Sequence, residues 1–240
     1  HIISYDWVPG KTLYEADDLE VYTKFFDWVS TNLWSPNLSE YSMSFDKLCH
    51  KFYKEKTYDR YNQYKSQTKQ KERLIVNDKV CFTMDKYLKN IDWNSLVGVP
   101  TNMFHGDLQF DNVIYNQKLG EFTLIDWRDD FGGSAEIGDV HYDLAKLYGG
   151  MLINYRLMRD SNNAQVFYEH DTVITQHTKT PNLNHARNYF ESWVTTLGYD
   201  LKIIKIITGL IFLNMSPLHE ENFSEFLFYR AKELFYDINK

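Results

Sequence analysis

The sequence of 240 residues contains only two cysteines, Cys49 and Cys81. Two cysteines cannot form the disulfide framework of a small secreted domain, and they fit a reducing compartment. No secretory signal pattern opens the sequence. The longest apolar run, Ile203 to Leu213, is interrupted by Lys205 and Thr208 and is too short to cross a bilayer. We therefore expect a cytoplasmic protein without a membrane span.

Basic residues are also in the minority, because 26 Lys and Arg stand against 33 Asp and Glu, giving a formal net charge of −7. An acidic chain does not attract the negatively charged phosphate backbone of DNA or RNA, so we expect no nucleic-acid partner. Apolar residues make up 43% of the chain, which excludes wholesale disorder and supplies a substantial core. The length allows one large domain or two small ones.

A stretch in the middle of the chain has a pattern typical of phosphoryl transfer. It runs from Phe104 through His105 and Asp107 to Asn112, and Asp126 follows a second apolar β run. Four residues separate Asp107 from Asn112, which is the spacing of the kinase catalytic loop. In that loop the Asp accepts the proton of the substrate hydroxyl and the Asn holds a metal ion. The pattern therefore predicts Asp107 as the catalytic base and Asn112 and Asp126 as metal ligands.

At these residues the chain resembles the aminoglycoside phosphotransferase and choline kinase family of small-molecule kinases. That family carries His-Gly-Asp-x-x-x-x-Asn, then Ile-Asp-Trp or Ile-Asp-Phe, and then a helix opening Asp-Leu-Ala, which here begins at Asp143. Gly106 stands where a protein kinase has Arg, which favours a small-molecule kinase. The motifs cover residues 104 to 146, and a weaker likeness, including residues 214 to 219, extends to the C-terminus. The resemblance implies an α+β, mostly helical fold: the C-terminal lobe of a protein-kinase-like fold, with small β-hairpins at the catalytic loop.

The resemblance implies further roles along the chain. Mg²⁺ and ATP are the implied cofactors, His105 supports the catalytic loop, and Asp143 bonds its backbone. Residues 1–10 are implied to form the interlobe hinge, where Tyr5, Asp6 and Trp7 meet the adenine, although an ordinary edge strand also explains them. Residues 11–240 form the helical lobe. The sequence has no Gly-rich loop and no Val-Ala-Ile-Lys strand, so we expect the N-terminal nucleotide lobe to be missing and the chain alone to be inactive.

Periodicity predicts the secondary structure around this loop. Two short alternating runs, residues 165–168 and 172–175, predict a β-hairpin, and residues 51–71 are expected to present a solvated helical face because acidic residues interrupt the basic ones. Residues 10–12 resemble a P-loop but lack its earlier glycine, so they are predicted to form a turn into a helix. The predicted helices span residues 17 or 18 to 34, 44–63, 78–89, 140–159, 184–197, 200–213 and 224–238.

The acceptor is the least determined part of the prediction. Carboxylates cluster after the second metal ligand, and a carboxylate-rich cleft favours a cationic acceptor. Aromatic rings nearby offer faces for a quaternary ammonium, although core packing is the better explanation for any single ring. Choline or a related amino alcohol is our first expectation, and an aminoglycoside or sugar is the second. The residues concerned are Trp127, Asp129, Asp130, Glu136, Asp139, Tyr142 and Trp193.

Two other functions remain open on the sequence alone. The chain could be an inactive or truncated kinase-like lobe that serves as a binding module. It could also be a metal-dependent phosphoesterase, which needs several His or carboxylate ligands converging on one or two metals. That alternative leaves the spacing of Asn112 unexplained. Its ligands would come from His105, Asp107, Asp126, His141 and Asp143.

Overall fold

The computed structural model describes residues 7–34 and 44–240. Tyr5, Asp6 and the strand predicted at the start of the chain therefore lie outside the described residues. About 55% of the chain is helical and the sheets are small, so the prediction of a mostly helical α+β fold is confirmed at that level.

The order of elements interleaves short strands with longer helices. The helices are α1 (Leu13–Ala16), α2 (Leu19–Asn32), α3 (Phe45–Cys49), the π-helix η1 (His50–Glu55), α4 (Lys56–Gln67), α5 (Met84–Asn90), α6 (Val140–Leu152), α7 (Pro181–Thr196), α8 (Leu201–Met215) and α9 (Glu221–Ile238). The strands are β1 (Lys11–Thr12), β2 (Ile75–Val76), β3 (Lys79–Val80), β4 (Pro100–Thr101), β5 (Val113–Asn116), β6 (Glu121–Leu124), β7 (Gly138–Asp139), β8 (Ala164–Glu169) and β9 (Thr172–His177).

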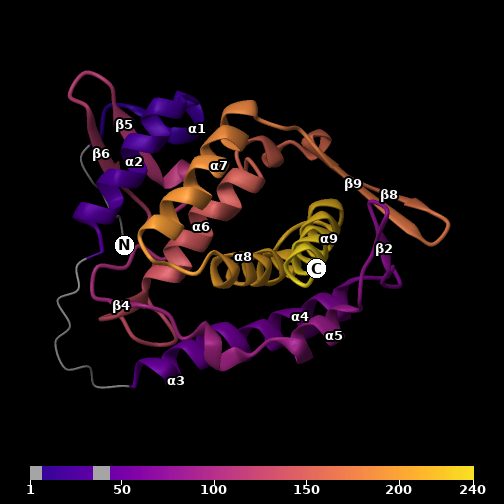
Figure 1. Ribbon diagram of the computed structural model, residues 1–240. Helices are drawn as coiled ribbons and strands as arrows, with labels where there is room; N and C mark the ends of the chain where they lie inside the picture. Colours follow the sequence, from indigo (N-terminus) through magenta and orange to yellow (C-terminus); the bar gives the residue numbers. More distant parts are fainter. Residues whose placement is uncertain (1–6, 35–43) are drawn as a thin grey trace, which may run out of the picture.

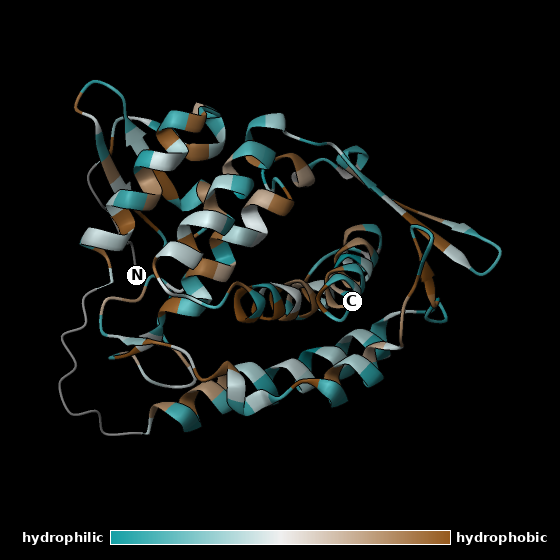
Figure 2. Cartoon of the chain, viewed as in Figure 1, coloured by the Kyte–Doolittle hydropathy of each residue, from teal (hydrophilic) through white to brown (hydrophobic). Residues whose placement is uncertain are grey.

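Helix α8 lies at the centre of the molecule, packed against α6 and α9 and over α4 (Figure 1). Its sequence is almost entirely apolar, and the side chains from Ile207 to Leu213 are buried. In Figure 2, α8 is largely hydrophobic, whereas α4 and α5 carry many hydrophilic residues. A Cβ on Gly209 would lie 2.8 Å from the ring of Phe235, so glycine permits the close approach of α9. Burial of apolar surface by α8 is thus the main tie between the helices.

One described segment, Leu201–Leu218, is long and apolar enough to cross a membrane by length and composition. Of that segment 56% is buried inside the protein. A core helix of a folded domain has the same properties, because both environments exclude water from an apolar helix. The packing of α8 between α6 and α9 accounts for its composition.

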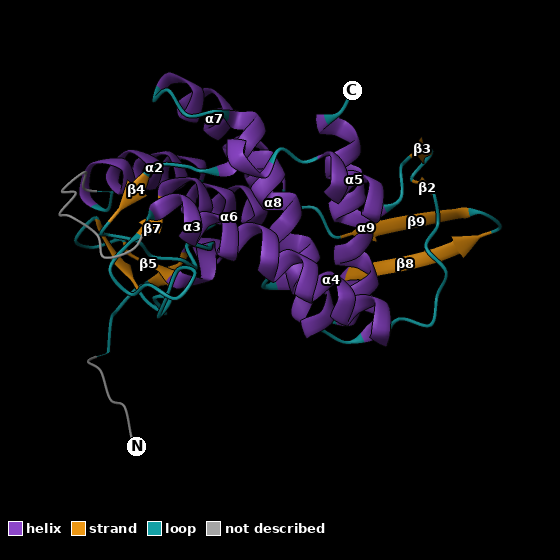
Figure 3. Ribbon diagram, turned by 90° about the horizontal axis from the view of Figure 1, so that it is seen from below, coloured by secondary structure: helices purple, strands orange, loops and turns teal. Residues whose placement is uncertain are grey.

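Three small sheets lie at the two ends of the helical body (Figure 3). The strands β1, β5 and β6 form one antiparallel sheet in which Val113 pairs with Leu124. The strands β4 and β7 form a second, two-stranded antiparallel sheet. At the other end, the order is β3-β2-β9-β8, with β2 parallel to β9. The hairpin predicted in residues 165–175 is confirmed as β8 and β9.

The helix predicted over residues 78–89 is wrong in its first half. Asn77 and Asp78 both have positive φ, 47° and 64°, so they form the tight turn of a β2–β3 hairpin. The helix α5 begins only at Met84, where the hydroxyl of Thr83 accepts a hydrogen bond from the amide of Lys86. Periodicity missed this hairpin because each strand has two residues, too few to show alternation.

The helix predicted over residues 140–159 ends at Leu152, seven residues early. The hydroxyl of Tyr14 donates to the carbonyl oxygens of Gly150 and Ile153. A side chain from α1 thus bonds carbonyls at the C-terminus of α6, which is one of the ways a helix can end. The other long helices agree with their predicted ranges within about four residues at each end.

Candidate active site

One buried carboxylate on α6 holds the backbone of the loop that contains Asp107. The amides of His105 and Gly106 donate to the two oxygens of Asp143, at 3.1 and 2.8 Å. The indole of Trp34 donates to the same carboxylate at 3.2 Å. Burial raises the pKa of Asp143 to about 7, and these three donors oppose that shift. The loop is therefore fixed to the first turn of α6.

His105 lies beneath the loop and is fully buried. Its Nδ1 accepts the amide hydrogen of Asp107 at 3.1 Å, and its Nε2 donates to the carbonyl oxygen of Ile125 at 2.9 Å. These partners require the neutral ring with the proton on Nε2. Burial lowers the pKa of His105 to about 4, and Trp127 stacks on the ring at 4.9 Å between centroids. Both ring nitrogens form hydrogen bonds with backbone groups, so His105 connects Asp107 to Ile125, which follows β6.

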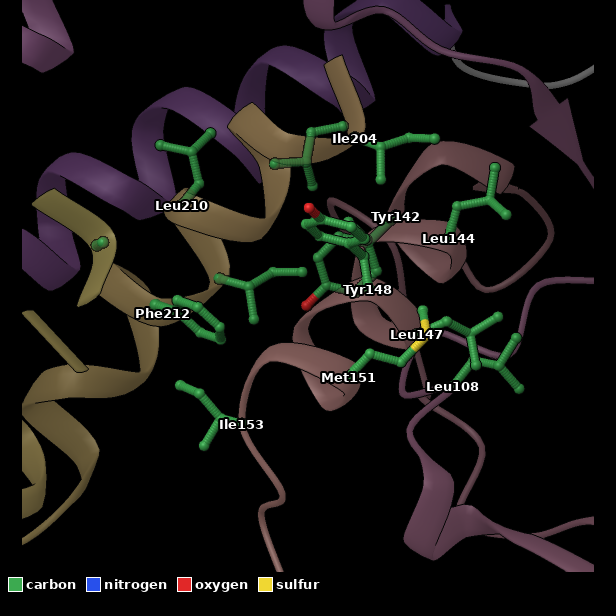
Figure 4. Packing of buried hydrophobic residues seen from close by; sticks show 14 of the residues in the cluster. Leu108, Tyr142, Leu144, Leu147, Tyr148, Met151, Ile153, Ile204, Leu210 and Phe212 are labelled. Carbon is green, nitrogen blue, oxygen red and sulfur yellow. The ribbon is translucent and has the colours of Figure 1, made fainter. Parts of the chain in front are cut away.

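Asn112 joins the same network through its side-chain amide. Its Nδ2 donates to the backbone oxygen of Asp107 at 2.8 Å and to the Oδ2 atom of Asp107 at 3.1 Å. The loop between them is anchored by Leu108, which is fully buried and lies beside Leu147 and Met151 of α6 in Figure 4. The side-chain nitrogen of Asn112 therefore makes two hydrogen bonds to Asp107. Its Oδ1 has no hydrogen bond within the described part of the chain.

Lys146 is a site residue that the sequence prediction missed. Its Nζ lies 2.6 Å from Oδ1 of Asp107, and the lysine side chain is only 9% exposed against 33% for Asp107. Asp143 and Lys146 are three residues apart on α6, a spacing that places side chains on one face of a helix. Since Asp143 was predicted to face the loop, the same spacing implies that Lys146 faces it as well. This spacing is the signal that could have identified it.

Asp126 follows the β6 run in a left-handed backbone conformation, with φ 57°. Such a conformation is strained for a residue other than glycine and is often found at functional sites. Pairing of β5 with β6, and a 3.0 Å bond from the amide of Ile125 to the carbonyl of Asn112, bring Asn112 and Asp126 close along the backbone. The exposed carboxylate of Asp126 has no hydrogen bond or ion pair with any described residue. Asn112 Oδ1 and this carboxylate are therefore oxygen atoms without a partner among the described residues. Oxygen atoms of this kind are the ligands that Mg²⁺ requires.

The five residues considered for a phosphoesterase do not form a ligand cluster. Over residues 7–34 and 44–240, no three His, Cys, Asp or Glu side chains come together as metal ligands. Both ring nitrogens of His105 and both oxygens of Asp143 are engaged with the loop, and His141 packs against Tyr199 at 5.7 Å. This geometry gives the phosphoesterase alternative no support.

A cleft of about 580 Å³ lies beside the Asp107–Lys146 pair. It separates η1 and α4 from α8 and from the start of α6, and Lys56 and Arg60 of α4 line it half-buried. The prediction that residues 51–71 form only a solvated face is therefore wrong for these two side chains. The full lining is Lys51, Phe52, Glu55, Lys56, Asp59, Arg60, Gln63, Arg128, Asp130, Gly132, Gly133, Tyr142, Lys146, Ile211, Asn214, Met215 and Leu218.

The residues predicted to bind an acceptor are divided by the structure. Asp130 and Tyr142 line the cleft, whereas Trp127 and Asp129 are exposed outside its lining. Asp139 is fully buried at the start of α6. The indole of Trp193 donates to Asp27, and its rings pack in the core between α2 and α7. Core packing thus explains Trp193, and the carboxylate cluster seen in the sequence is not a cluster in space.

Of the three predicted hinge residues only Trp7 is described, and its side chain is 88% exposed. Beyond it, β1 pairs with β5, with Lys11 opposite Tyr115, and Thr12 caps α1 in a capping box with Glu15. The turn predicted at residues 10–12 is therefore wrong for Lys11 and Thr12, which form β1, whereas the predicted lead into a helix is confirmed by α1. Comparisons with protein-family models, curated proteins and solved structures found no match to this chain.

Proposed function

We propose that this chain is the catalytic lobe of an ATP-dependent small-molecule kinase, which transfers the γ-phosphoryl group of ATP to a hydroxyl group. The observation that carries the proposal is the loop itself. Asp107 is held between Asn112 and Lys146, and the uncommitted oxygens of Asn112 and Asp126 lie at the ends of two paired strands. The resemblance to the aminoglycoside phosphotransferase and choline kinase family at the same residues supports it.

Asp107 is proposed to act as the base. A carboxylate offers about four lone-pair positions, and the amide of Asn112 and the ammonium of Lys146 occupy two of them. The remaining positions accept the proton of the acceptor hydroxyl. The hydroxyl oxygen then forms a bond to the γ-phosphorus, the bond from phosphorus to the β–γ bridging oxygen breaks, and ADP leaves. Lys146 and Asn112 act by holding the carboxylate in place.

Asn112 and Asp126 are proposed to hold Mg²⁺ through their free oxygens. When bound, Mg²⁺ neutralises the charge of nucleotide phosphate oxygens. The strained backbone of Asp126 is maintained by the pairing of β5 with β6 and by His105, which bonds the carbonyl of the preceding residue. The protein's part is thus to hold the backbone of both residues in place before nucleotide arrives.

The other elements of a kinase are proposed to come from outside the described helical body. In kinases a Gly-rich loop covers the phosphates and a lysine on a strand pairs with them, and this sequence has neither. We propose that residues 1–10, with Tyr5, Asp6 and Trp7, form the hinge to such a nucleotide lobe, and that residues 11–240 form the catalytic lobe. A binding module without catalysis is the alternative, but it gives no reason for uncommitted oxygens on Asn112 and Asp126.

The test compares two aspartates with different proposed roles. In the complete protein, Asp107→Asn should lower kcat by a factor on the order of 10²–10⁴ and leave the affinity for Mg·ATP within about threefold, because the base acts only in the chemical step. Asp126→Asn should instead abolish the Mg²⁺-dependent part of nucleotide binding, measured by titration calorimetry.

The matched control is Asp129→Asn. It removes an exposed carboxylate that lies three residues after Asp126 and outside the cleft. Its kcat and its affinity for Mg·ATP should equal those of the unsubstituted protein. Near-normal turnover by Asp107→Asn would remove Asp107 from the mechanism, and Mg²⁺-dependent ATP binding by Asp126→Asn would remove the proposed metal site.

A further inference from the structure

The cleft beside Asp107 is basic, although the chain as a whole is acidic. Five Lys and Arg side chains line it against three Asp and Glu side chains. The three acidic residues, Glu55, Asp59 and Asp130, are exposed at its rim. Among the basic residues, Lys146 is buried, and Lys56, Arg60 and Arg128 are half-buried. Positive charge is therefore concentrated in the deeper part of the cleft.

Three of these cations have no carboxylate partner. Within the described part of the chain, Lys56, Arg60 and Arg128 form no salt bridge shorter than 4.0 Å. Arg60 donates to the side-chain oxygen of Gln63 at 2.9 Å, and Arg128 donates through Nε to the carbonyl of Gly106 at 3.2 Å. The remaining guanidinium hydrogens are free. Grouping unpaired cations costs free energy, because like charges repel and burial removes part of their hydration.

The surroundings of Lys56 show this cost directly. Burial, together with repulsion from Arg128, Arg60 and Lys146, lowers the pKa of Lys56 to about 8, although Asp130 at the rim opposes the shift. Its ammonium rests over the ring of Phe52 at 4.1 Å, and Arg128 lies 5.4 Å from the same ring. Aromatic faces hold the cations in position without neutralising them.

We propose that this cationic cleft binds an oxyanion, and that the acceptor of the kinase reaction is a small hydroxyl compound bearing a phosphate or carboxylate group. The inference rests on the proposed function for its second half, because only a kinase has an acceptor. It replaces the expectation of a cationic acceptor, which relied on Asp129, Asp139 and other carboxylates that the structure does not gather in the cleft. A phosphate dianion fits best, since two arginines present planar forks suited to its oxygens.

Two of the lining residues connect the oxyanion to the reacting end. Arg128 bonds the loop directly, through its amide to the carbonyl of His105 at 2.8 Å and through Nε to Gly106. Lys146 lines the cleft and also bonds Asp107. An anion held by Arg128 and Arg60 would thus place the rest of a small molecule beside Asp107, which is the positioning that phosphoryl transfer needs.

The backbone of η1 contributes to this arrangement. Lys51, Phe52 and Glu55 reach the cleft from the six residues that form the π-helix. A π-helix places its side chains at a different angular spacing from an α-helix, and π segments occur often at functional sites. In this chain the segment ends at Glu55, directly before Lys56, so Lys56 and Arg60 follow on one face of α4.

Binding of small anions to residues 1–240 tests the proposal without any turnover. Titrations monitored by NMR would use inorganic phosphate, glycerol phosphate, glycerate and choline as separate probes. We expect glycerol phosphate and phosphate to bind, glycerate to bind more weakly, and choline not to bind. Lys56→Gln and Arg60→Gln should each weaken phosphate binding by about tenfold, the effect of losing one charged hydrogen-bond donor.

Lys65→Gln is the matched control, because Lys65 is on the same helix but outside the cleft, 3.9 Å from Asp85. It removes the same charge and should leave phosphate affinity within about twofold. Thermal unfolding of each variant would show that it is folded. Equal phosphate binding by Lys56→Gln, Arg60→Gln and the unsubstituted chain would overturn the proposal, and so would binding of choline without phosphate.

Two further arms separate this inference from the proposed function. If Mg·ATP displaces the phosphate bound at Lys56 and Arg60, these two side chains bind the nucleotide phosphates. The assignment of the cleft to the acceptor is then overturned. Asp126→Asn should leave phosphate binding unchanged, since Asp126 does not line the cleft. If neither the unsubstituted protein nor any variant binds ATP in a Mg²⁺-dependent way, the proposed kinase function is contradicted, but the oxyanion site is not. If phosphate alone fails to bind, only the oxyanion site is contradicted.

Discussion

The carboxylate of Asp107 is oriented by contacts from two separate elements. Asn112 approaches Oδ2 from within the loop, and Lys146 approaches Oδ1 from α6. The backbone of the same residue is bonded to Nδ1 of His105. A carboxylate fixed by a cation, an amide and its own backbone loses little rotamer entropy when a substrate arrives, which is the physical advantage of a preorganised base.

His105 should make stability depend on pH in a defined direction. Its pKa is lowered from 6.5 to about 4 in the folded protein, because burial disfavours the charged ring. The unfolded chain therefore binds more protons between pH 4 and 6.5, so the contribution of His105 is full above pH 6.5 and is lost as the pH falls towards 4. The total change is on the order of 3 kcal/mol.

The measurement compares His105→Gln with the unsubstituted protein in urea unfolding at several pH values. The difference in unfolding free energy between them should grow from pH 4 to 6.5 and stay constant above pH 7. His177, whose pKa burial also lowers to about 4, is present in both proteins and cancels from the difference. A difference that does not change with pH would contradict the neutral buried ring.

Helix α6 is the element that assembles the site, and its start is held by Asp139. The Oδ1 atom of Asp139 accepts from the amides of His141 and Val99 at 2.9 and 3.0 Å, and Oδ2 accepts from the hydroxyl of Tyr53 at 2.7 Å. Burial raises the pKa of Asp139. One N-cap residue thus joins α6 to the segment before β4 and to η1, the element that forms one wall of the cleft.

Asp139→Ala should be far more destabilising than loss of an ordinary cap. An exposed N-cap is worth about 1 kcal/mol, and removing Asp139 also leaves the buried hydroxyl of Tyr53 unpaired at about 1–3 kcal/mol. We expect a loss of roughly 2–4 kcal/mol. Asp200→Ala is the matched control, because Asp200 caps α8 with the amides of Lys202 and Ile203 alone. Similar losses for both variants in chemical denaturation would contradict the linking role of Asp139.

The long helices were predictable because their apolar spacing is a local property. The hairpin β2–β3 was not, since its strands are too short. The end of α6 was not predicted either, and the contact that Tyr14 makes with its carbonyls comes from a segment far away in the chain. The candidate base and ligands, Asp107, Asn112 and Asp126, lie close in sequence and share a motif. Lys56 and Arg60 come from a segment far away in the chain, and no local pattern indicates that they line the same cleft as Lys146.

The cleft as a whole depends on how the body is assembled around α8. Its walls come from residues 51–63, 128–146 and 211–218, three segments that meet only because α4, α6 and α8 pack together. The net charge of −7 describes the whole surface and hides a basic cavity within it. The position of each charge relative to the core therefore carries information that the total charge does not.

Packing around one central helix also predicts how residues 1–240 behave by themselves. Since α8 contacts α4, α6, α7 and α9, the helical body should unfold in a single cooperative transition. Mg·ATP should bind weakly, with a Kd on the order of 1 mM, because only Asn112 and Asp126 and the hinge backbone would hold it. Turnover should be nearly absent, since no Gly-rich cover or phosphate-pairing lysine of the kind used by kinases occurs in this sequence.

Calorimetry with Mg·ATP and a coupled ADP-release assay, run with choline and separately with glycerol phosphate, would measure both quantities. Addition of a nucleotide lobe in the complete protein should raise turnover, whereas Asp107→Asn should abolish that gain. Micromolar binding of Mg·ATP together with turnover near 10 s⁻¹, an ordinary kcat, by residues 1–240 alone would contradict the prediction. The elements that cover the phosphates would then lie within these residues, and the assignment of Tyr5, Asp6 and Trp7 to an interlobe hinge would be wrong.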